Sequence, residues 1–202
     1  MNRVKFIYFD VGGVLVDWSR AFHTAANRFH LKIEDIGAVF DEHHDQITKG
    51  LITSQELWSS CVKKYHIQNG DVFNFVASWV SDYRPIVEMH DLVKKLAAVY
   101  KIGLLSNIYQ GMLPLLLKNE VIPKIGYDRI ILSCDVGLMK PETDIYELAQ
   151  EKTGVKANNI LLVDDRPDFL SPAQQLGWHT FLFDNKRIDK SVDKIRKYLQ
   201  TA

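Results

Sequence analysis

Residues 4–17 read VKFIYFDVGGVLVD, and the fold is decided in this stretch. Its run from Phe6 to Phe9 is long enough for a strand buried on both faces and too short for a helix. Asp10 ends the run, and Gly12 and Gly13 then allow a sharp turn and a close approach of a ligand to the main chain. Because ligands of parallel sheets bind beyond the carboxyl ends of the strands, Asp10 is the first candidate for chemistry. A capped turn, in which Asp and Gly are common, explains this stretch alone equally well.

The bulk properties indicate a globular protein without a nucleic-acid or membrane footprint. The chain has 202 residues, enough for one domain or for a core with an insertion, and its formal net charge is +0. The opening apolar run is broken too early for a signal peptide, and no stretch is apolar for long enough to span a bilayer. Cys61 and Cys134 are the only cysteines and lie far apart, so we expect no disulfide framework and a cytoplasmic location.

After Asp17 the sequence changes to helical periodicity. Apolar residues recur at helical spacing up to about residue 83, and Ser54 and Asp71 are expected to cap two of the helices. From Pro85 helices and strands alternate, with strands expected at 102–105, 130–132, 160–163 and 180–183. This alternation predicts an α/β fold with a doubly wound parallel sheet, into which a helical segment is inserted after the first strand.

Polar side chains follow four of the predicted strands, at their ends or in the loop beyond. They are Asp10, Ser106 and Asn107, Lys140, and Asp164 and Asp165. Clustered carboxylates repel one another unless a cation neutralises them, and oxygen ligands beside a phosphate site suit Mg²⁺. An amine and a hydroxyl suit phosphate oxygens, and a carboxylate that faces a metal-bound phosphate can attack phosphorus.

These motifs resemble the haloacid dehalogenase superfamily of phosphohydrolases, in the family's order and with similar spacing. The matching segments are DVGGVLVD at 10–17, LLSN at 104–107, Ser133 with GLMKP at 137–141, and LLVDD at 161–165. Each motif alone is weak, but four in order at predicted strand ends form a specific pattern. The resemblance covers nearly the whole chain and implies a Rossmann-like catalytic core at residues 1–17 and 85–202. The helical segment at 18–84 resembles the small cap domain of the first subclass.

The resemblance also implies a role for each matched residue. Asp10 is expected to be the nucleophile, and Lys140 to orient it and balance its charge. The expected Mg²⁺ ligands are Asp10, the Gly12 carbonyl, Asp164 and Asp165. The phosphoryl group is expected to meet Ser106, Asn107, Lys140, Gly12 and Gly13.

One position departs from the family's phosphatases, which usually carry a second Asp two residues after the nucleophile. Here that residue is Gly12, which has no side chain to protonate the leaving group. General acid–base help contributes ~10²–10⁴-fold, so three outcomes remain open. The substrate has a good leaving group, as anomeric sugar phosphates and acyl phosphates do; another residue supplies the proton; or the activity is vestigial.

The function predicted from the sequence is Mg²⁺-dependent hydrolysis of a small phosphorylated metabolite through an aspartyl phosphate. Sugar phosphates are among the candidates, because members with this Gly resemble sugar-1-phosphate phosphatases. A non-catalytic protein that binds a phosphorylated ligand or a partner is one alternative, and a 2-haloacid dehalogenase is another. We expect a monomer or a homodimer that binds neither nucleic acid nor membrane.

Overall fold

The structure is a computed structural model that describes residues 4–201, so residues 1–3 and 202 of the predicted core lie outside it. Its main sheet has five parallel strands in the order β5-β4-β1-β6-β7. These strands are β1 (Phe6–Phe9), β4 (Lys101–Ser106), β5 (Arg129–Leu132), β6 (Ile160–Asp164) and β7 (His179–Leu182). The predicted α/β fold with a parallel sheet is confirmed, and every predicted strand is present within about a residue at each end.

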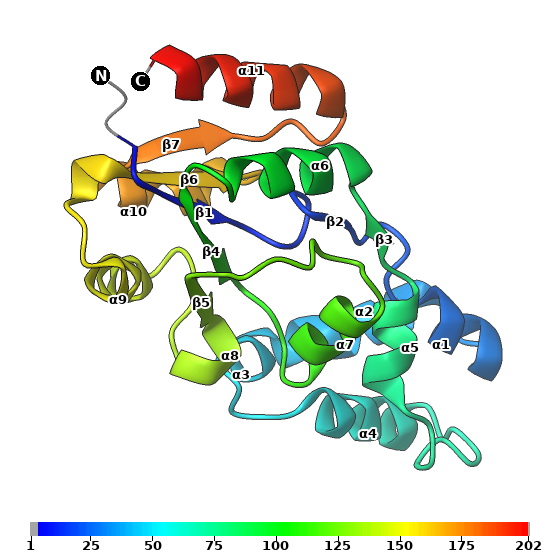
Figure 1. The fold of residues 1–202 in the computed structure, drawn as a ribbon. Helices are drawn as coiled ribbons and strands as arrows, with labels where there is room; N and C mark the ends of the chain where they lie inside the picture. The colour runs from blue at the N-terminus through cyan, green and yellow to red at the C-terminus, as the bar shows by residue number, and fades with distance from the viewer. Residues whose placement is uncertain (1–3, 202) are drawn as a thin grey trace.

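Helices cover both faces of the sheet because β1 is apolar on both sides. Ile7 and Phe9 pack in one core cluster with α6 and α11, and Phe6 and Tyr8 pack in a second cluster with α9 and α10. Figure 1 shows α6 and α11 side by side near the top of the view. The helices of this part are α6 (Val87–Leu96), α7 (Met112–Lys118), α8 (Ser133–Val136), α9 (Thr143–Thr153), α10 (Pro167–Gln175) and α11 (Ile188–Thr201).

The inserted segment leaves and rejoins the core at one place. Two short antiparallel strands, β2 (Val16–Asp17) and β3 (Arg84–Pro85), pair with each other there. Five helices lie between them and gather in the lower part of Figure 1, with α5 against α7. They are α1 (His23–Phe29), α2 (Ile33–Glu42), α3 (His44–Thr48), α4 (Ser54–Lys64) and α5 (Phe75–Ser81).

Two predicted helix caps are wrong, and in each case a neighbouring residue makes a better cap. Thr53 caps α4, since its hydroxyl accepts from the Glu56 N–H while the Glu56 carboxylate accepts from the Thr53 N–H. Asn74 caps α5 by accepting from the Ala77 N–H, and α5 therefore starts later than Asp71 would allow.

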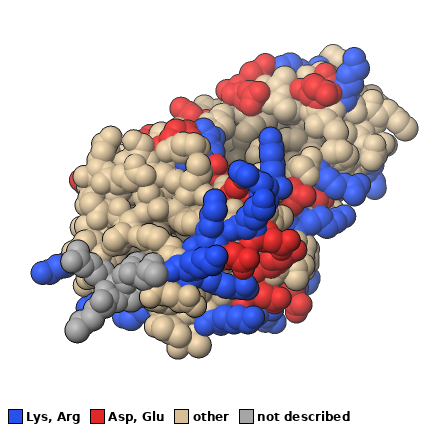
Figure 2. All heavy atoms as spheres, turned by 90° about the horizontal axis from the view of Figure 1, so that it is seen from above, with Lys and Arg blue, Asp and Glu red and all other residues tan. Residues whose placement is uncertain are grey.

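The surface shows no dominance of one charge sign on the face drawn in Figure 2. Lys and Arg side chains lie beside Asp and Glu side chains there, with wide uncharged areas between them. Both cysteines are free and buried. Of the helices within residues 4–201, none has the length and apolarity that crossing a bilayer requires.

Candidate active site

Three of the predicted site residues form a buried ion-pair cluster at the carboxyl ends of the central strands. Asp10 follows β1, and its main-chain N–H donates to the Val163 carbonyl, which sets it level with Asp164 at the end of β6. The Lys140 ammonium lies 3.0 Å from Asp10 Oδ1 and 2.6 Å from Asp164 Oδ2. Lys140 is 1% exposed and lies 4.9 Å from the centre of the Phe169 ring. A buried amine between two carboxylates fixes the position of both.

Asp165 adds a third carboxylate beside the glycine turn. Gly13 has φ +76°, a conformation that favours glycine, and a Cβ there would lie 2.1 Å from Asp165 Oδ2 and displace that carboxylate. The Asn185 amide donates to the same oxygen at 3.1 Å. Asn185 lies shortly after β7, at the same edge of the sheet, and is not among the predicted site residues. Applying the strand-end rule to the fifth strand would have found it.

The acidic cluster fits a divalent cation. Asp10, Asp164 and Asp165 each offer an oxygen, and these atoms lie within 4.8 Å of one another. Asp10 is buried, and the Lys140 ammonium, 3.0 Å from Asp10 Oδ1, is the cationic group that faces it. A hard cation such as Mg²⁺ prefers carboxylate and carbonyl oxygens, so these residues suit it.

The pKa shifts of the clustered residues also indicate a cation at this site. Burial raises the pKa of Asp10 to about 6, with Lys140 opposing and the Asp164 carboxylate adding to the shift. Burial, and then the charge of Asp164, also raises the pKa of Asp165. For Lys140 burial acts to lower the pKa, but the two carboxylates outweigh it and leave this pKa raised. One ammonium therefore does not balance the carboxylates, and a cation would supply the missing positive charge.

Ser106 and Asn107 lie at the end of β4, as predicted, but Ser106 acts on Asp10 whereas Asn107 binds the main chain of Lys140. Ser106 is buried, and its hydroxyl acts to lower the pKa of Asp10. The Asn107 side chain binds the main chain of Lys140 twice, donating to its carbonyl and accepting from its N–H, each at 2.8 Å. The carboxamide thus positions the loop that carries Lys140.

Gly12 lies beside an aromatic ring that the insertion contributes. A Cβ at Gly12 would meet only Trp18, at 3.6 Å from Cδ1, which is ordinary contact. Trp18 is 55% exposed. The site therefore has room for a side chain at the position where the family's phosphatases usually carry the second Asp.

The insertion closes on this edge through contacts that the sequence did not indicate. Lys49, after α3, forms an ion pair with Glu142, just before α9. Gly50 packs on the main chain of Cys134 in α8, and its carbonyl accepts from the Gln110 amide at 3.0 Å. Nothing in the sequence pairs these residues, because their separation along the chain exceeds any local pattern.

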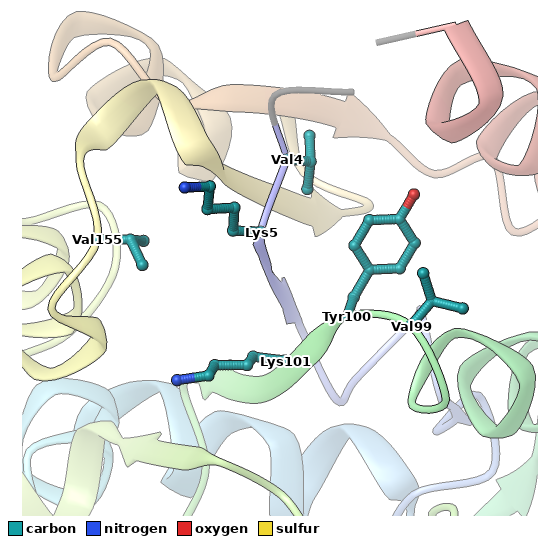
Figure 3. A pocket seen from close by; sticks show the side chains of 6 residues that line it. All are labelled: Val4, Lys5, Val99, Tyr100, Lys101 and Val155. Atoms are coloured by element: carbon teal, nitrogen blue, oxygen red, sulfur yellow. The ribbon is translucent and has the colours of Figure 1, made fainter. Parts of the chain in front are cut away.

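A cavity of about 510 Å³ lies at the opposite edge of the sheet and is unrelated to this cluster. Figure 3 shows Lys5 and Lys101, which lie at the amino-terminal ends of β1 and β4, among its lining side chains. The ends of the strands that carry Asp10 and Asp164 point away from it. We place the functional site at the carboxyl edge because the buried charges converge there.

The parallel sheet, the insertion after the first strand and the acidic edge define a class of α/β hydrolytic enzymes. A family model described as haloacid dehalogenase-like hydrolase matches residues 7–183. The chain belongs to this family, and the predicted resemblance is confirmed.

Curated relatives include both partial and nearly full-length matches. Mouse bifunctional epoxide hydrolase 2 is 37% identical over 59 residues, which are 29% of this chain and 11% of that protein. The chain thus matches only a small part of this relative's length. D-ribitol-5-phosphate phosphatase of Bacteroides thetaiotaomicron is 25% identical over 196 residues, covering 90% of this chain and 93% of the relative.

Solved structures share the whole architecture. A HAD family enzyme from Bacteroides thetaiotaomicron, crystallised with magnesium and inorganic phosphate, superposes with a TM-score of 0.75 at 25% identity. The match covers 90% of this chain and 95% of that one. A defluorinating L-2-haloacid dehalogenase reaches a TM-score of 0.68 at 22% identity, covering 89% and 80%, and this likeness concerns the fold alone.

Proposed function

We propose that this protein is a Mg²⁺-dependent phosphate monoester hydrolase that acts on a small phosphorylated metabolite through an aspartyl phosphate. The observation that carries the proposal is Asp10, which is buried at the carboxyl edge of the sheet, ion-paired to Lys140 and grouped with the Asp164 and Asp165 carboxylates. A carboxylate held in this way is suited to attack an electrophilic phosphorus. The phosphatase and the phosphate-bound enzyme among the similar proteins support the same chemistry.

In the first step Asp10 supplies the electron pair. A carboxylate oxygen bonds to phosphorus, the bond from phosphorus to the ester oxygen breaks, and the alcohol leaves. In the second step a water oxygen bonds to the phosphorus of the aspartyl phosphate and the bond from phosphorus to the Asp10 oxygen breaks. The Asp10 carboxylate is restored, and inorganic phosphate leaves with the protons of the water, which it exchanges with solvent. Lys140 holds Asp10 in place and offsets its charge, and Ser106 and the main chain at Gly12 and Gly13 contact the phosphoryl oxygens.

Asp10, Asp164, Asp165 and the Gly12 carbonyl would hold the Mg²⁺. When bound, the ion neutralises charge on the phosphoryl oxygens. Asn107 positions the Lys140 loop, and Asn185 holds the Asp165 carboxylate. Because Gly12 offers no acid, the leaving oxygen takes its proton from water or from a group on the substrate side.

We also propose that residues 18–84 act as a cap domain on a core formed by residues 1–17 and 85–202. The paired strands β2 and β3 support a hinge at this boundary. The contacts of Lys49 and Gly50 with the core support a closed position of the cap, which would shield the reaction from bulk water.

Phosphate release from a panel of small phosphate esters tests the proposal. We expect release that requires Mg²⁺, stops with a chelator and is lost in Asp10→Asn. Asp189→Asn, which changes an exposed carboxylate on α11, serves as the matched control and should retain full activity. Folded protein that releases no phosphate from any ester would favour a binding protein, and halide release from 2-haloacids without metal would favour a dehalogenase.

A further inference from the structure

The Phe169 ring contacts one buried cation and one exposed cation. Its centre lies 4.9 Å from the Lys140 ammonium and 4.1 Å from the guanidinium carbon of Arg166. The Lys140 side chain is fully buried, whereas the Arg166 side chain is 57% exposed. The face of an aromatic ring carries negative charge density and attracts a cation within about 6 Å of its centre. Phe169 therefore links a surface side chain to the amine that contacts Asp10.

Hydrogen bonds hold the Arg166 guanidinium and the Phe169 main chain in place. Nε and Nη2 of Arg166 donate to the two carboxylate oxygens of Asp168, at 3.1 and 2.6 Å, in a forked arrangement. The Arg166 main-chain N–H donates to Asp164 Oδ1 at 2.9 Å. The Tyr146 hydroxyl donates to the Phe169 carbonyl at 2.6 Å. An exposed ion pair contributes little to stability, so the effect of this one is geometric: it keeps the planar guanidinium over the ring.

The Phe169 ring is suited to its place because it attracts the Lys140 ammonium without competing for its hydrogen bonds. The ammonium has three N–H donors, and the Asp10 and Asp164 carboxylates lie 3.0 and 2.6 Å from its nitrogen. Two contacts leave the end of a flexible four-carbon chain free to shift between the carboxylates. The ring adds a third contact, and since it has no polar atom it takes no bond from either carboxylate. The third contact restrains the amine where it meets Asp10.

We propose that Phe169 and Arg166 are positioning residues for Lys140: the forked guanidinium holds the ring, and the ring holds the ammonium against Asp10. The inference rests on the proposed function, in which Lys140 orients the nucleophile. Neither residue contacts the phosphoryl group in this scheme. The Arg166 side chain therefore acts on Asp10 only through Phe169 and Lys140.

Exchange of the Lys140 ammonium protons with water tests the restraint directly. NMR of protein that contains isotopically labelled lysine measures it, and the signal is assigned by its correlation with the Lys140 backbone. With Mg²⁺ present, we expect exchange to be about 3- to 10-fold faster than in the wild type for Phe169→Leu and about 2- to 5-fold faster for Arg166→Ala, because the ammonium leaves its partners more often. A merely structural role would speed the exchange of backbone amides instead.

Hydrolysis of 4-nitrophenyl phosphate with Mg²⁺ is measured on the same variants. We expect kcat to fall by about 3- to 10-fold in Phe169→Leu and by less in Arg166→Ala. The double variant should be no slower than Phe169→Leu, because the guanidinium acts only through the ring. Phe169→Tyr keeps the ring face and is expected to retain most of kcat. Arg166→Ala changes an exposed side chain, so it tests the inference even if Phe169→Leu does not fold.

The control is Arg196→Ala, which removes an exposed arginine that is ion-paired to Asp193 on α11. It should change neither the exchange nor kcat. Exchange and kcat that stay at the wild-type level in Phe169→Leu or in Arg166→Ala, or losses that add up in the double variant, overturn the inference. If the wild type hydrolyses the ester and the variants match it, only the inference fails; if the wild type hydrolyses no ester, the proposed function fails and the inference with it.

Discussion

Gly12 is the residue at which this chain departs from the family's phosphatases, and its surroundings make the departure testable. A Cβ there meets only the Trp18 ring at ordinary contact distance, and its φ lies outside the left-handed region. The main chain therefore tolerates a side chain, and the missing acid does not result from lack of space.

We predict that Gly12→Asp increases hydrolysis of alkyl phosphates, whose leaving groups need a proton. The gain should exceed about tenfold and approach the ~10²–10⁴ range of general acid catalysis, while aryl phosphates should gain less. The measurement is kcat for both ester types in the presence of Mg²⁺. Gly12→Asn has the same shape and cannot donate an acidic proton, so an equal gain in Gly12→Asn would contradict this explanation.

Residues that end a strand are predictable from the sequence, whereas residues that meet across the fold are not. Asp10, Ser106, Lys140 and Asp164 lie at one edge, as predicted, because parallel strands bring their carboxyl ends together there. The ion pair of Lys49 with Glu142 carries no such signal, because the two residues meet only across the fold.

At the scale of elements, the turn after α3 shows how closely the insertion packs on the core. Gly50 has φ +69°, and a Cβ there would lie 2.1 Å from the Cys134 carbonyl oxygen. A main-chain atom cannot move aside as a flexible side chain does, so only glycine fits this contact.

Gly50→Ala should therefore destabilise the protein by more than backbone strain alone. Gly154 supplies the matched control, because its φ is +68° and nothing lies within 4 Å of a Cβ placed there. We expect Gly154→Ala to cost about 1–2 kcal/mol for the left-handed conformation, and Gly50→Ala to cost roughly 1–3 kcal/mol more for the clash. Urea unfolding of both variants measures the difference, and equal losses would show that the α3 turn can move away from α8.

The elements themselves were largely predictable, and their ends were less so. All five core strands follow from apolar runs bounded by polar or glycine residues. The two-residue strands β2 and β3 carry no signal in the sequence because so short a segment has no periodicity, and the single turn of α8 has none either. The misplaced caps at Ser54 and Asp71 reflect competition between polar residues one to three positions apart, which only the three-dimensional hydrogen bonds decide.

At the scale of the whole molecule, the acidic edge links metal binding to stability and pH. Burial, reinforced by Asp164 against the opposing Lys140, raises the pKa of Asp10 to about 6. A carboxyl whose pKa is raised by folding holds its proton more tightly in the folded than in the unfolded state. Without metal, this group therefore favours folding at lower pH, and its stabilising effect is lost as the pH rises through about 6.

The effect of Mg²⁺ should run in the opposite direction. Below the raised pKa of Asp10 the cation must displace a proton, so its affinity should fall by about tenfold per pH unit for one proton. We predict that Mg²⁺ raises the melting temperature clearly near neutral pH and much less well below pH 6, and that a chelator abolishes the difference. Thermal unfolding followed by circular dichroism measures both. In Asp10→Asn the pH dependence should weaken, and an unchanged dependence would assign it to another group.

The carboxylate of Glu142 contacts both the insertion and the loop that carries Lys140. One of its oxygens pairs with Lys49 of the insertion, and the other accepts from the Met139 N–H at 3.1 Å, next to Lys140, whose amine contacts Asp10. The Glu142 side chain thus joins the insertion to the loop that carries Lys140, in the manner of an interlock. In the proposed opening of the cap, Glu142 would lose its contact with Lys49 and keep only the contact with Met139, so the Lys140 loop would be held most firmly while the cap is closed.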